Sequence, residues 1–206
     1  MGSNPTLGIM QTELEAKFID IDRAAIRDRL KKLGAKLIAP ERLMRRRNYD
    51  YPDLRLEKER AGWIRVRDEG NKITLAYKQL DNRGLHGTKE VMIGVNNFDT
   101  TCLLLETIGF KQTSYQETKR ESWQLAGADI EIDEWPWIPP FLEIEAPDEP
   151  TLKSLAEKLG FDFKKALHGS VEIVYQQYYK VTDQDVDRWP NITFSPVPED
   201  LMAKQL

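Results

Sequence analysis

Polar and apolar residues alternate near the start of the chain. In residues 13–18, the charged residues Glu13, Glu15 and Lys17 take every second position and apolar residues stand between them. Successive side chains of a β-strand point to opposite faces, so the stretch predicts a strand with one charged and one apolar face. Glu13 and Glu15 would lie about 7 Å apart and repel each other unless a cation lay between them. Their oxygens suit Mg²⁺ or Mn²⁺, although a strand face in contact with solvent would have the same pattern.

A sequence of strand, Asp- or Asn-rich cap and glycine-terminated helix occurs three times. An acid or amide before the first turn and a glycine just past the last turn are typical helix boundaries. Short helices with one apolar side are suited to cover the apolar face of a sheet. The expected helices are residues 20–33 before Gly34, residues 99–108 before Gly109 and residues 148–159 before Gly160.

Further stretches show the alternation of strands, and several are joined by short turns that contain glycine. They are residues 37–49, 63–67, 73–78, 90–95, 117–123, 129–134 and 141–145. Together with the first strand they make about eight strands, nearly all connected as hairpins. The pattern predicts an α+β fold with an antiparallel sheet or barrel and helices packed outside.

The 206 residues divide into a leader, one domain and a tail. We expect residues 1–9 to be an expression remnant or a disordered arm, with Met10 as the natural start, and residues 10–180 to form the domain. Residues 181–206 contain several prolines and predict an irregular tail with at most one short helix. Residues 169–180 predict a helix with an aromatic stripe, which could cap the domain or form a homodimer contact.

Composition narrows the classes of function. The chain is 40% hydrophobic and 31% charged, which is enough apolar sequence for a core. A net charge of −4 argues against a general nucleic-acid binder. We see no apolar run of membrane-spanning length and no signal peptide, so no membrane partner is expected.

Cysteine and histidine are scarce. Cys102 is the one cysteine, so no disulfide can form within the chain, which fits a reducing compartment such as the cytoplasm. It lies in an apolar helical run and is expected to be a buried thiol. With only His86 and His168 besides, a zinc site made of His and Cys is not expected. His86, beside two glycines, is expected in a loop.

The polar faces of the later strands carry short runs of one sign of charge. Residues that share a face are Arg65 with Arg67; Lys78 with Thr74; Asp129 with Glu131 and Asp133; and Glu143 with Glu145, while Glu90 stands opposite an apolar neighbour. If these faces point inward, they line a water-filled space with basic and acidic walls. Basic walls bind a polyanion and acids hold the cation that it shares, as phosphoryl transfer requires. A solvated outer face is the alternative.

Two basic runs are ambiguous by alternation alone. Lys119 and Arg120 are adjacent, so only one can face inward, and Arg120 is favoured because it is in phase with Thr118 and Ser122. At most one or two of residues 45–47, all arginines, can face a ligand. The Trp- and Pro-rich residues 135–140 predict a structural corner.

A set of motifs occurs in a characteristic order. It begins with ExExK at Glu13, Glu15 and Lys17 and continues with Asn48–Asp50, residues 63–67, Thr74 to Lys78, Lys89–Glu90, Lys119–Arg120, Asp133–Glu134 and residues 141–145. Over residues 10–180 this set resembles the CYTH domain, also called the triphosphate tunnel metalloenzymes. The family name covers class IV adenylyl cyclases and thiamine triphosphatases.

The resemblance implies an eight-stranded antiparallel β-barrel with helices packed outside, a tunnel that binds a triphosphate-bearing small molecule with Mg²⁺ or Mn²⁺. It implies that Lys17 orients or helps to activate the attacking water. The residues it assigns to the metal are Glu13, Glu15, Glu90, Asp133, Glu143 and Glu145. Those it assigns to phosphate oxygens are Arg46, Arg65, Arg67, Lys78 and Arg120, with Lys119 as the alternative to Arg120.

Two positions depart from the family pattern. Thr118 stands where the family often has a lysine, two residues before Arg120, so one phosphate contact could be absent. Pro139 and Pro140 stand where many members have a glycine before the last acidic pair. This changes the expected loop and not the acids.

Three functions remain open. The first is a metal-dependent triphosphatase acting on inorganic triphosphate or a small organic triphosphate. The second is a class IV adenylyl cyclase, and the third is a non-catalytic module that binds polyphosphate. A glycosidase with two carboxylates is not favoured, because basic walls serve no purpose for a neutral sugar.

Overall fold

The computed structural model describes residues 11–82, 84–85 and 87–206. The expectations for residues 1–9 and for His86 concern positions outside the described residues. The strands are β1 (Gln11–Glu13), β2 (Glu15–Phe18), β3 (Lys36–Asp50), β4 (Gly62–Asp68), β5 (Ile73–Leu80), β6 (Thr88–Val95), β7 (Lys111–Leu125), β8 (Ala128–Glu134), β9 (Phe141–Glu145) and β10 (Asn191–Ile192). The helices are α1 (Arg23–Lys32), α2 (Arg55–Arg60), α3 (Phe98–Thr107), α4 (Glu149–Lys158), the 3-10 turn η1 (Phe163–Lys165), α5 (Glu172–Tyr175), α6 (Asp183–Asp187) and α7 (Glu199–Met202).

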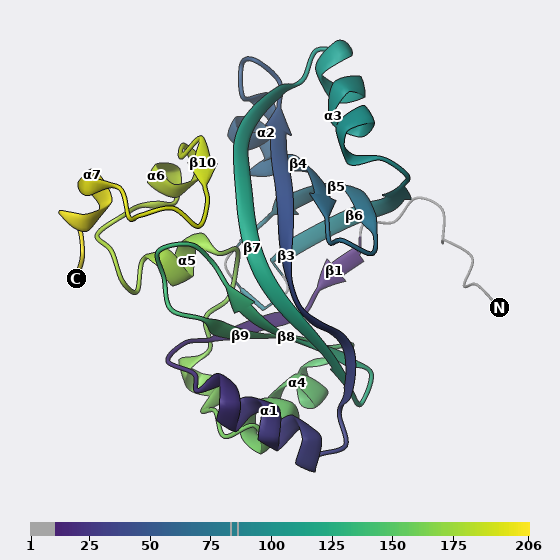
Figure 1. Cartoon of the computed structure of the whole chain (residues 1–206), viewed down its shortest axis with the longest axis vertical. Coiled ribbons are helices and arrows are strands. Elements are labelled where there is room, and N and C mark those ends of the chain that lie inside the picture. The colour runs from purple at the N-terminus through teal and green to yellow at the C-terminus, as the bar shows by residue number, and fades with distance from the viewer. Residues whose placement is uncertain (1–10, 83, 86) are drawn as a thin grey trace.

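The strands form one sheet in the order β1-β6-β5-β4-β3-β7-β8-β9-β2, and β10 pairs beside β7. Neighbouring strands are antiparallel except for the parallel pair of β10 and β7. The long, curved strands β3 and β7 lie side by side through the centre of the molecule, joining its upper and lower halves in Figure 1.

The α+β class with an antiparallel sheet is confirmed, but the eight-stranded closed barrel is not. The described part of the chain contains ten strands, and β1 and β2 are the two ends of the sheet. The difference arises at Leu14, which divides the expected first strand so that β1 pairs with β6 and β2 with β9. The carbonyl of Leu14 instead accepts a hydrogen bond from the backbone N–H of Ala146, at 3.0 Å.

The three expected helices are confirmed as α1, α3 and α4; α1 and α4 are shorter than expected, and α3 is shifted by one residue. The side chains of Asp22, Asn97 and Asp148 cap them by accepting backbone N–H groups of the first turn. The glycine after each helix has a positive φ, for example +104° at Gly109, a conformation that costs other residues steric strain. Local sequence thus determines where these helices begin and end.

Helices α1 and α4 cover the apolar sides of β2, β8 and β9. Ile26 and Leu30 of α1 and Leu152 of α4 are fully buried in a core that also contains Ile130 and Ile144 of the strands. In Figure 1 this layer forms the lower end of the molecule. Because side chains alternate along a strand, the polar sides of the same strands face away from these helices.

A second core lies between α3 and the outer faces of β3 and β4. It contains Tyr49, Val66, Phe98 and Cys102, and Cys102 is 1% exposed. The expectation of a buried thiol is confirmed. No helix in the described part of the chain combines the length and apolar character needed to cross a bilayer.

The C-terminal segment is more ordered than expected. The predicted helix at residues 169–180 is reduced to α5, and the segment that follows contains α6, β10 and α7 rather than a single short helix. Tyr175 is fully buried and its hydroxyl donates to the carbonyl of Pro136 at 2.8 Å, so this segment packs on the Trp- and Pro-rich corner. This packing agrees with the capping role that was one of the two expectations for the aromatic stripe.

Candidate functional site

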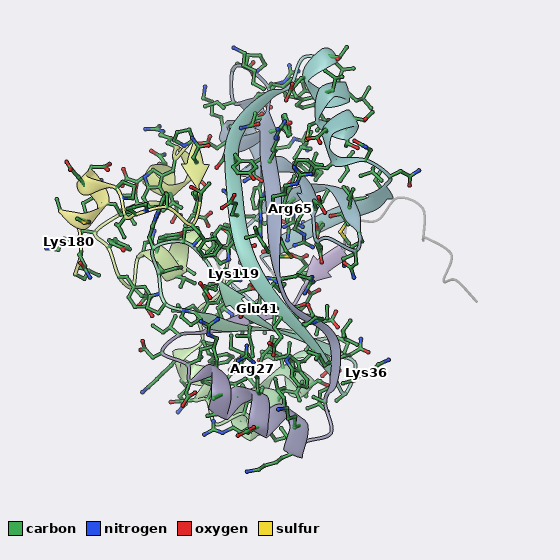
Figure 2. All side chains as sticks on the ribbon, in the orientation of Figure 1. Arg27, Lys36, Glu41, Arg65, Lys119 and Lys180 are labelled. Atoms are coloured by element: carbon green, nitrogen blue, oxygen red, sulfur yellow. The ribbon has the colours of Figure 1, made fainter. Side chains whose placement is uncertain are left out.

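The charged faces of the strands line one cavity of about 1180 Å³. The predicted residues in its walls are Glu13, Glu15, Lys17, Arg46, Arg65, Arg67, Lys78, Glu90, Arg120, Asp133, Glu143 and Glu145. Most of these side chains are buried or half-buried around the cavity, although Glu145 is exposed, which favours the inward-facing interpretation over a solvated outer surface. Figure 2 shows Arg65 in the middle of the molecule among the strands, whereas Lys180 lies at its margin beside the C-terminal helices.

Carboxylates from three adjacent strands meet at one side of the cavity. Strand register aligns Glu15 of β2 with Glu145 of β9, and Glu145 with Asp129 of β8. The next row aligns Glu143 with Glu131. Burial, and then the charges of Glu143 and Glu15, raise the pKa of Glu145. These acids are close enough for mutual repulsion that a cation would relieve.

Lys17 is held rigidly among these acids. Its ammonium lies 3.0 Å from Glu15 Oε1 and 3.1 Å from Glu143 Oε2, and it donates to the carbonyl of Gly169 at 2.7 Å. Burial alone would lower the pKa of Lys17, but the charges of Glu143 and Glu15 outweigh it and raise the pKa. All three donors are used, so Lys17 stays protonated and orients its carboxylate neighbours.

Four arginines from β3, β4 and β7 form the basic part of the cavity wall, and one of them, Arg120, adjoins the acids. Burial, and then the charges of Arg65, Arg67 and Arg120, lower the pKa of Arg46 well below its usual range. Arg46 is 7% exposed, and its partners are the hydroxyl of Thr118 at 2.9 Å and the ring of Trp135 at 4.6 Å. Neither neutralises its charge.

A mixed group joins the two sides. Lys78 lies 2.8 Å from Glu13, and both Lys78 and Arg65 contact Glu90, at 3.6 and 3.0 Å. Burial, followed by a hydrogen bond with Glu90, raises the pKa of Glu13 to about 8. Glu13 therefore keeps its proton at neutral pH in the metal-free protein, whereas Glu90, next to Lys78 and Arg65, has a lowered pKa and stays charged.

Arg120, rather than Lys119, faces the cavity. Arg120 donates to Asp133 at 2.6 Å and to Glu143 at 3.1 Å. Lys119, predicted as a substrate-binding alternative, does not line the cavity: its amine lies 3.0 Å from Glu134 and over the ring of Phe194. Because side chains alternate along β7, Lys119 points to the outer face. The prediction of Lys119 as a substrate-binding residue is corrected accordingly.

The cavity wall also contains residues that were not predicted as site residues, among them the charged Arg42, Glu69, Lys72 and Glu131. Glu131 was predicted only as part of a charged face. Burial is the main cause that raises its pKa to about 7. Its Oε2 has no hydrogen-bond partner. The alternation of side chains could have predicted two of the others. Arg42 stands an even number of residues from Arg46, and Glu69 stands two residues after Arg67, so each is expected on the same face as that arginine.

The donor atoms of the acidic wall are of the type that suits a hard divalent cation, but their present arrangement is not that of a metal site. Among the described residues, no group of three or more His, Cys, Asp and Glu side chains is arranged to hold a metal ion. The carboxylates are instead occupied by Lys17, Lys78 and Arg120. Carboxylate oxygens are nevertheless the donors that Mg²⁺ and Mn²⁺ prefer, and a bound cation would relieve the repulsion of Glu145 by Glu143 and Glu15. Glu13, Glu15, Glu143 and Glu145 stay the predicted ligands, with Glu90 and Asp133 beside them.

Comparison with known proteins identifies the family. The CYTH domain matches residues 11–185 of the chain. The chain belongs to the CYTH family. A comparison with curated proteins gave no match.

Several solved structures share this CYTH fold. PH1012 from Pyrococcus horikoshii OT3 is 20% identical, with a TM-score of 0.62, and the match covers 75% of this chain and 93% of that one. A Vibrio parahaemolyticus protein proposed to be an adenylate cyclase is 16% identical, with a TM-score of 0.68 and coverage of 81% and 98%. A Hippeastrum adenylyl cyclase candidate, described as having a dominant triphosphatase activity, is 15% identical, with a TM-score of 0.55 and coverage of 89% and 97%.

Proposed function

We propose that this CYTH chain is a divalent-metal-dependent hydrolase of triphosphate-bearing small molecules, either inorganic triphosphate or a small organic triphosphate. The observation that carries the proposal is the burial of Arg46 beside Arg65, Arg67 and Arg120. A buried cation without a paired carboxylate is costly, and a polyanion would neutralise Arg46, whose three arginine neighbours already pair with carboxylates. Guanidinium groups also bind phosphate oxygens by paired hydrogen bonds.

The acids of the same cavity support a metal-dependent reaction. When bound, Mg²⁺ or Mn²⁺ supplies positive charge to the phosphate oxygens. Glu13, Glu15, Glu143 and Glu145 would hold it. Phosphoryl transfer needs mostly positioning and charge neutralisation, and a rigid pair of basic and acidic walls provides both.

Lys17 is proposed to act as a fixed positive charge. Its donors are taken by Glu15, Glu143 and the carbonyl of Gly169, and its raised pKa rules out a role as a base at neutral pH. It therefore orients the two carboxylates, and through them the attacking water. This is the first of the two roles that the family resemblance implied.

The second candidate is a class IV adenylyl cyclase, in which the ribose 3′-hydroxyl is the nucleophile. The same cavity would serve it, and the name of the Vibrio relative favours it, whereas the Hippeastrum protein is described as having a dominant triphosphatase activity. The two reactions differ in their products. Hydrolysis of a terminal phosphate releases orthophosphate, whereas cyclisation of ATP releases pyrophosphate and cyclic AMP.

A substrate panel tests the proposal. Inorganic triphosphate, ATP and a small organic triphosphate are incubated with the protein and Mg²⁺ or Mn²⁺, and orthophosphate, pyrophosphate and cyclic AMP are measured. Orthophosphate release that requires metal is expected. Pyrophosphate with cyclic AMP would establish the cyclase instead, and binding without any product would establish a non-catalytic module.

A variant links the activity to the cavity. Glu13→Gln removes a predicted ligand charge but no core contact, so metal-dependent turnover should fall at least a hundredfold while the thermal unfolding temperature stays near that of the unmodified protein. Glu134→Gln is the matched control, because Glu134 is ion-paired on the outer face. Equal activity of the Glu13 variant would contradict the assignment of the site.

A further inference from the structure

A buried carboxylate closes one end of the basic side. Glu69 lies in the turn between β4 and β5, and its side chain is 3% exposed in the wall of the cavity. It lies 2.6 Å from Arg67 Nη2, 3.1 Å from Arg42 Nη2 and 3.6 Å from Lys72 Nζ. Three cations from β3, β4 and the turn therefore share one internal counter-ion.

These contacts hold Arg42 and Glu69 in place. Arg42 also donates to the carbonyl of Arg120 and to the hydroxyl of Ser122, both at 3.0 Å, so that its position is tied to β7. Burial alone would raise the pKa of Glu69, but the charges of Arg67 and Lys72 outweigh it and lower the pKa. The carboxylate is therefore charged at neutral pH.

Glu69 divides the basic residues of the cavity into two groups. Arg65 pairs with Glu90, and Arg46 has a hydroxyl and an aromatic ring as its partners, so neither is held by Glu69. Arg67 shares its guanidinium with Glu69. Arg42 and Lys72 also pair with Glu69 in the cavity wall and would become available to phosphate if Glu69 were neutral.

We propose that Glu69 limits the number of phosphates that the cavity accepts, so that a triphosphate is bound in preference to a longer polyphosphate. The inference rests on the proposed function and adds a specificity-determining residue to it. A fourth phosphate would meet the carboxylate of Glu69 instead of the cations of Arg42 and Lys72. The carboxylate would repel that phosphate, and it already occupies Arg67, Arg42 and Lys72, the cations that would otherwise bind it.

The chain-length series in the unmodified protein is the first test. Calorimetric titration with inorganic pyrophosphate, triphosphate and tetraphosphate, each with Mg²⁺, should show affinity rising from two phosphates to three. It should then stay level or fall from three to four. A further tenfold rise with the fourth phosphate would overturn the inference.

Glu69→Gln is the second test. The variant keeps the shape of the side chain and removes its charge, so Arg42 and Lys72 become available to phosphate. The affinity for tetraphosphate relative to triphosphate should increase at least tenfold. Asp68→Asn is the matched control, since Asp68 lies one residue earlier and pairs with Arg45 on the outer face, at 3.2 Å. In this variant the affinity for tetraphosphate relative to triphosphate should not change.

The outcomes separate the inference from the proposed function. If the unmodified protein binds none of the three compounds, both are overturned. If it binds triphosphate but Glu69→Gln leaves the ratio unchanged, Glu69 has a structural role only and the inference alone fails. If the variant does not fold, as judged by its thermal unfolding, the series in the unmodified protein decides.

Discussion

Arg46 is a buried cation whose nearest charged neighbours are mostly cations. Its guanidinium is hydrogen-bonded to Thr118 and stacked on Trp135, and its Nε has no hydrogen-bond partner. Such a residue costs folding free energy, because both burial and like charge disfavour its ionised form. A side chain of this kind is more readily explained by ligand binding than by stability.

Replacement of Arg46 should separate binding from stability. In Arg46→Gln, the affinity for triphosphate should fall roughly ten- to hundredfold, the loss of one or two charge-assisted hydrogen bonds. The free energy of unfolding should stay level or rise, because a buried like charge is removed. Calorimetric titration and urea denaturation measure the two quantities.

The neighbouring arginine is the control. Arg45 lies on the other face of β3, where it pairs with Asp68, and its side chain is 43% exposed. Arg45→Gln should leave the affinity for triphosphate within about twofold, since exposed ion pairs contribute little. Equal losses in both variants would indicate a general charge effect and would contradict a specific role of Arg46.

The raised pKa values of Glu13 and Glu131 predict how stability depends on pH. Burial is the main cause of both shifts, to about 8 and about 7. A carboxyl with a raised pKa binds its proton more tightly in the folded state. Its contribution is therefore complete below about pH 4.5 and is lost as the pH rises through the folded value.

The metal-free protein should thus lose stability between about pH 5 and pH 8. The pKa values of Glu90 and Glu143 are lowered instead. Their contribution to the free energy of unfolding is lost on acidification, at pH values below this window. Urea denaturation in EDTA at several pH values measures the slope. Glu13→Gln should flatten it and Glu134→Gln should not; a slope unaffected by the Glu13 variant would contradict the assignment.

Among the elements, the hairpin of β7 and β8 shows which local features the sequence encodes. Its turn at Ala126 and Gly127 was expected from the glycine, and both residues have positive φ, +53° and +78°. The charged face of β8 followed from alternation alone. The interruption at Leu14 did not, because polar and apolar residues alternate straight through it and only long-range pairing divides the strand.

The same turn provides a stability prediction. Alanine in the left-handed region is strained, whereas asparagine tolerates it and Asn-Gly is the preferred pair for this type of turn. Ala126→Asn should raise the free energy of unfolding by about 0.5–1 kcal/mol without changing activity. Gly127→Ala should lower it, and a destabilised Ala126→Asn would contradict the assigned turn geometry.

At the scale of the whole molecule, the apolar faces of β2, β8 and β9 pack against helices α1 and α4, and charged faces of the strands line one cavity. The sequence predicted this division, and with it the inward direction of Glu13, Arg65 and Glu143. It could not predict which distant charges become partners. The pairing of Arg42 with Glu69, and of Lys17 with the carbonyl of Gly169, depends on strand register and on a loop from the far end of the chain.

The central claim is that the buried arginines of this CYTH chain bind a triphosphate. Calorimetric titration of the unmodified protein with inorganic triphosphate, in Mg²⁺ or Mn²⁺, tests it most directly. We predict saturable binding of one triphosphate per chain, with an affinity that falls as ionic strength rises. No saturable binding at millimolar triphosphate with either metal would contradict the account.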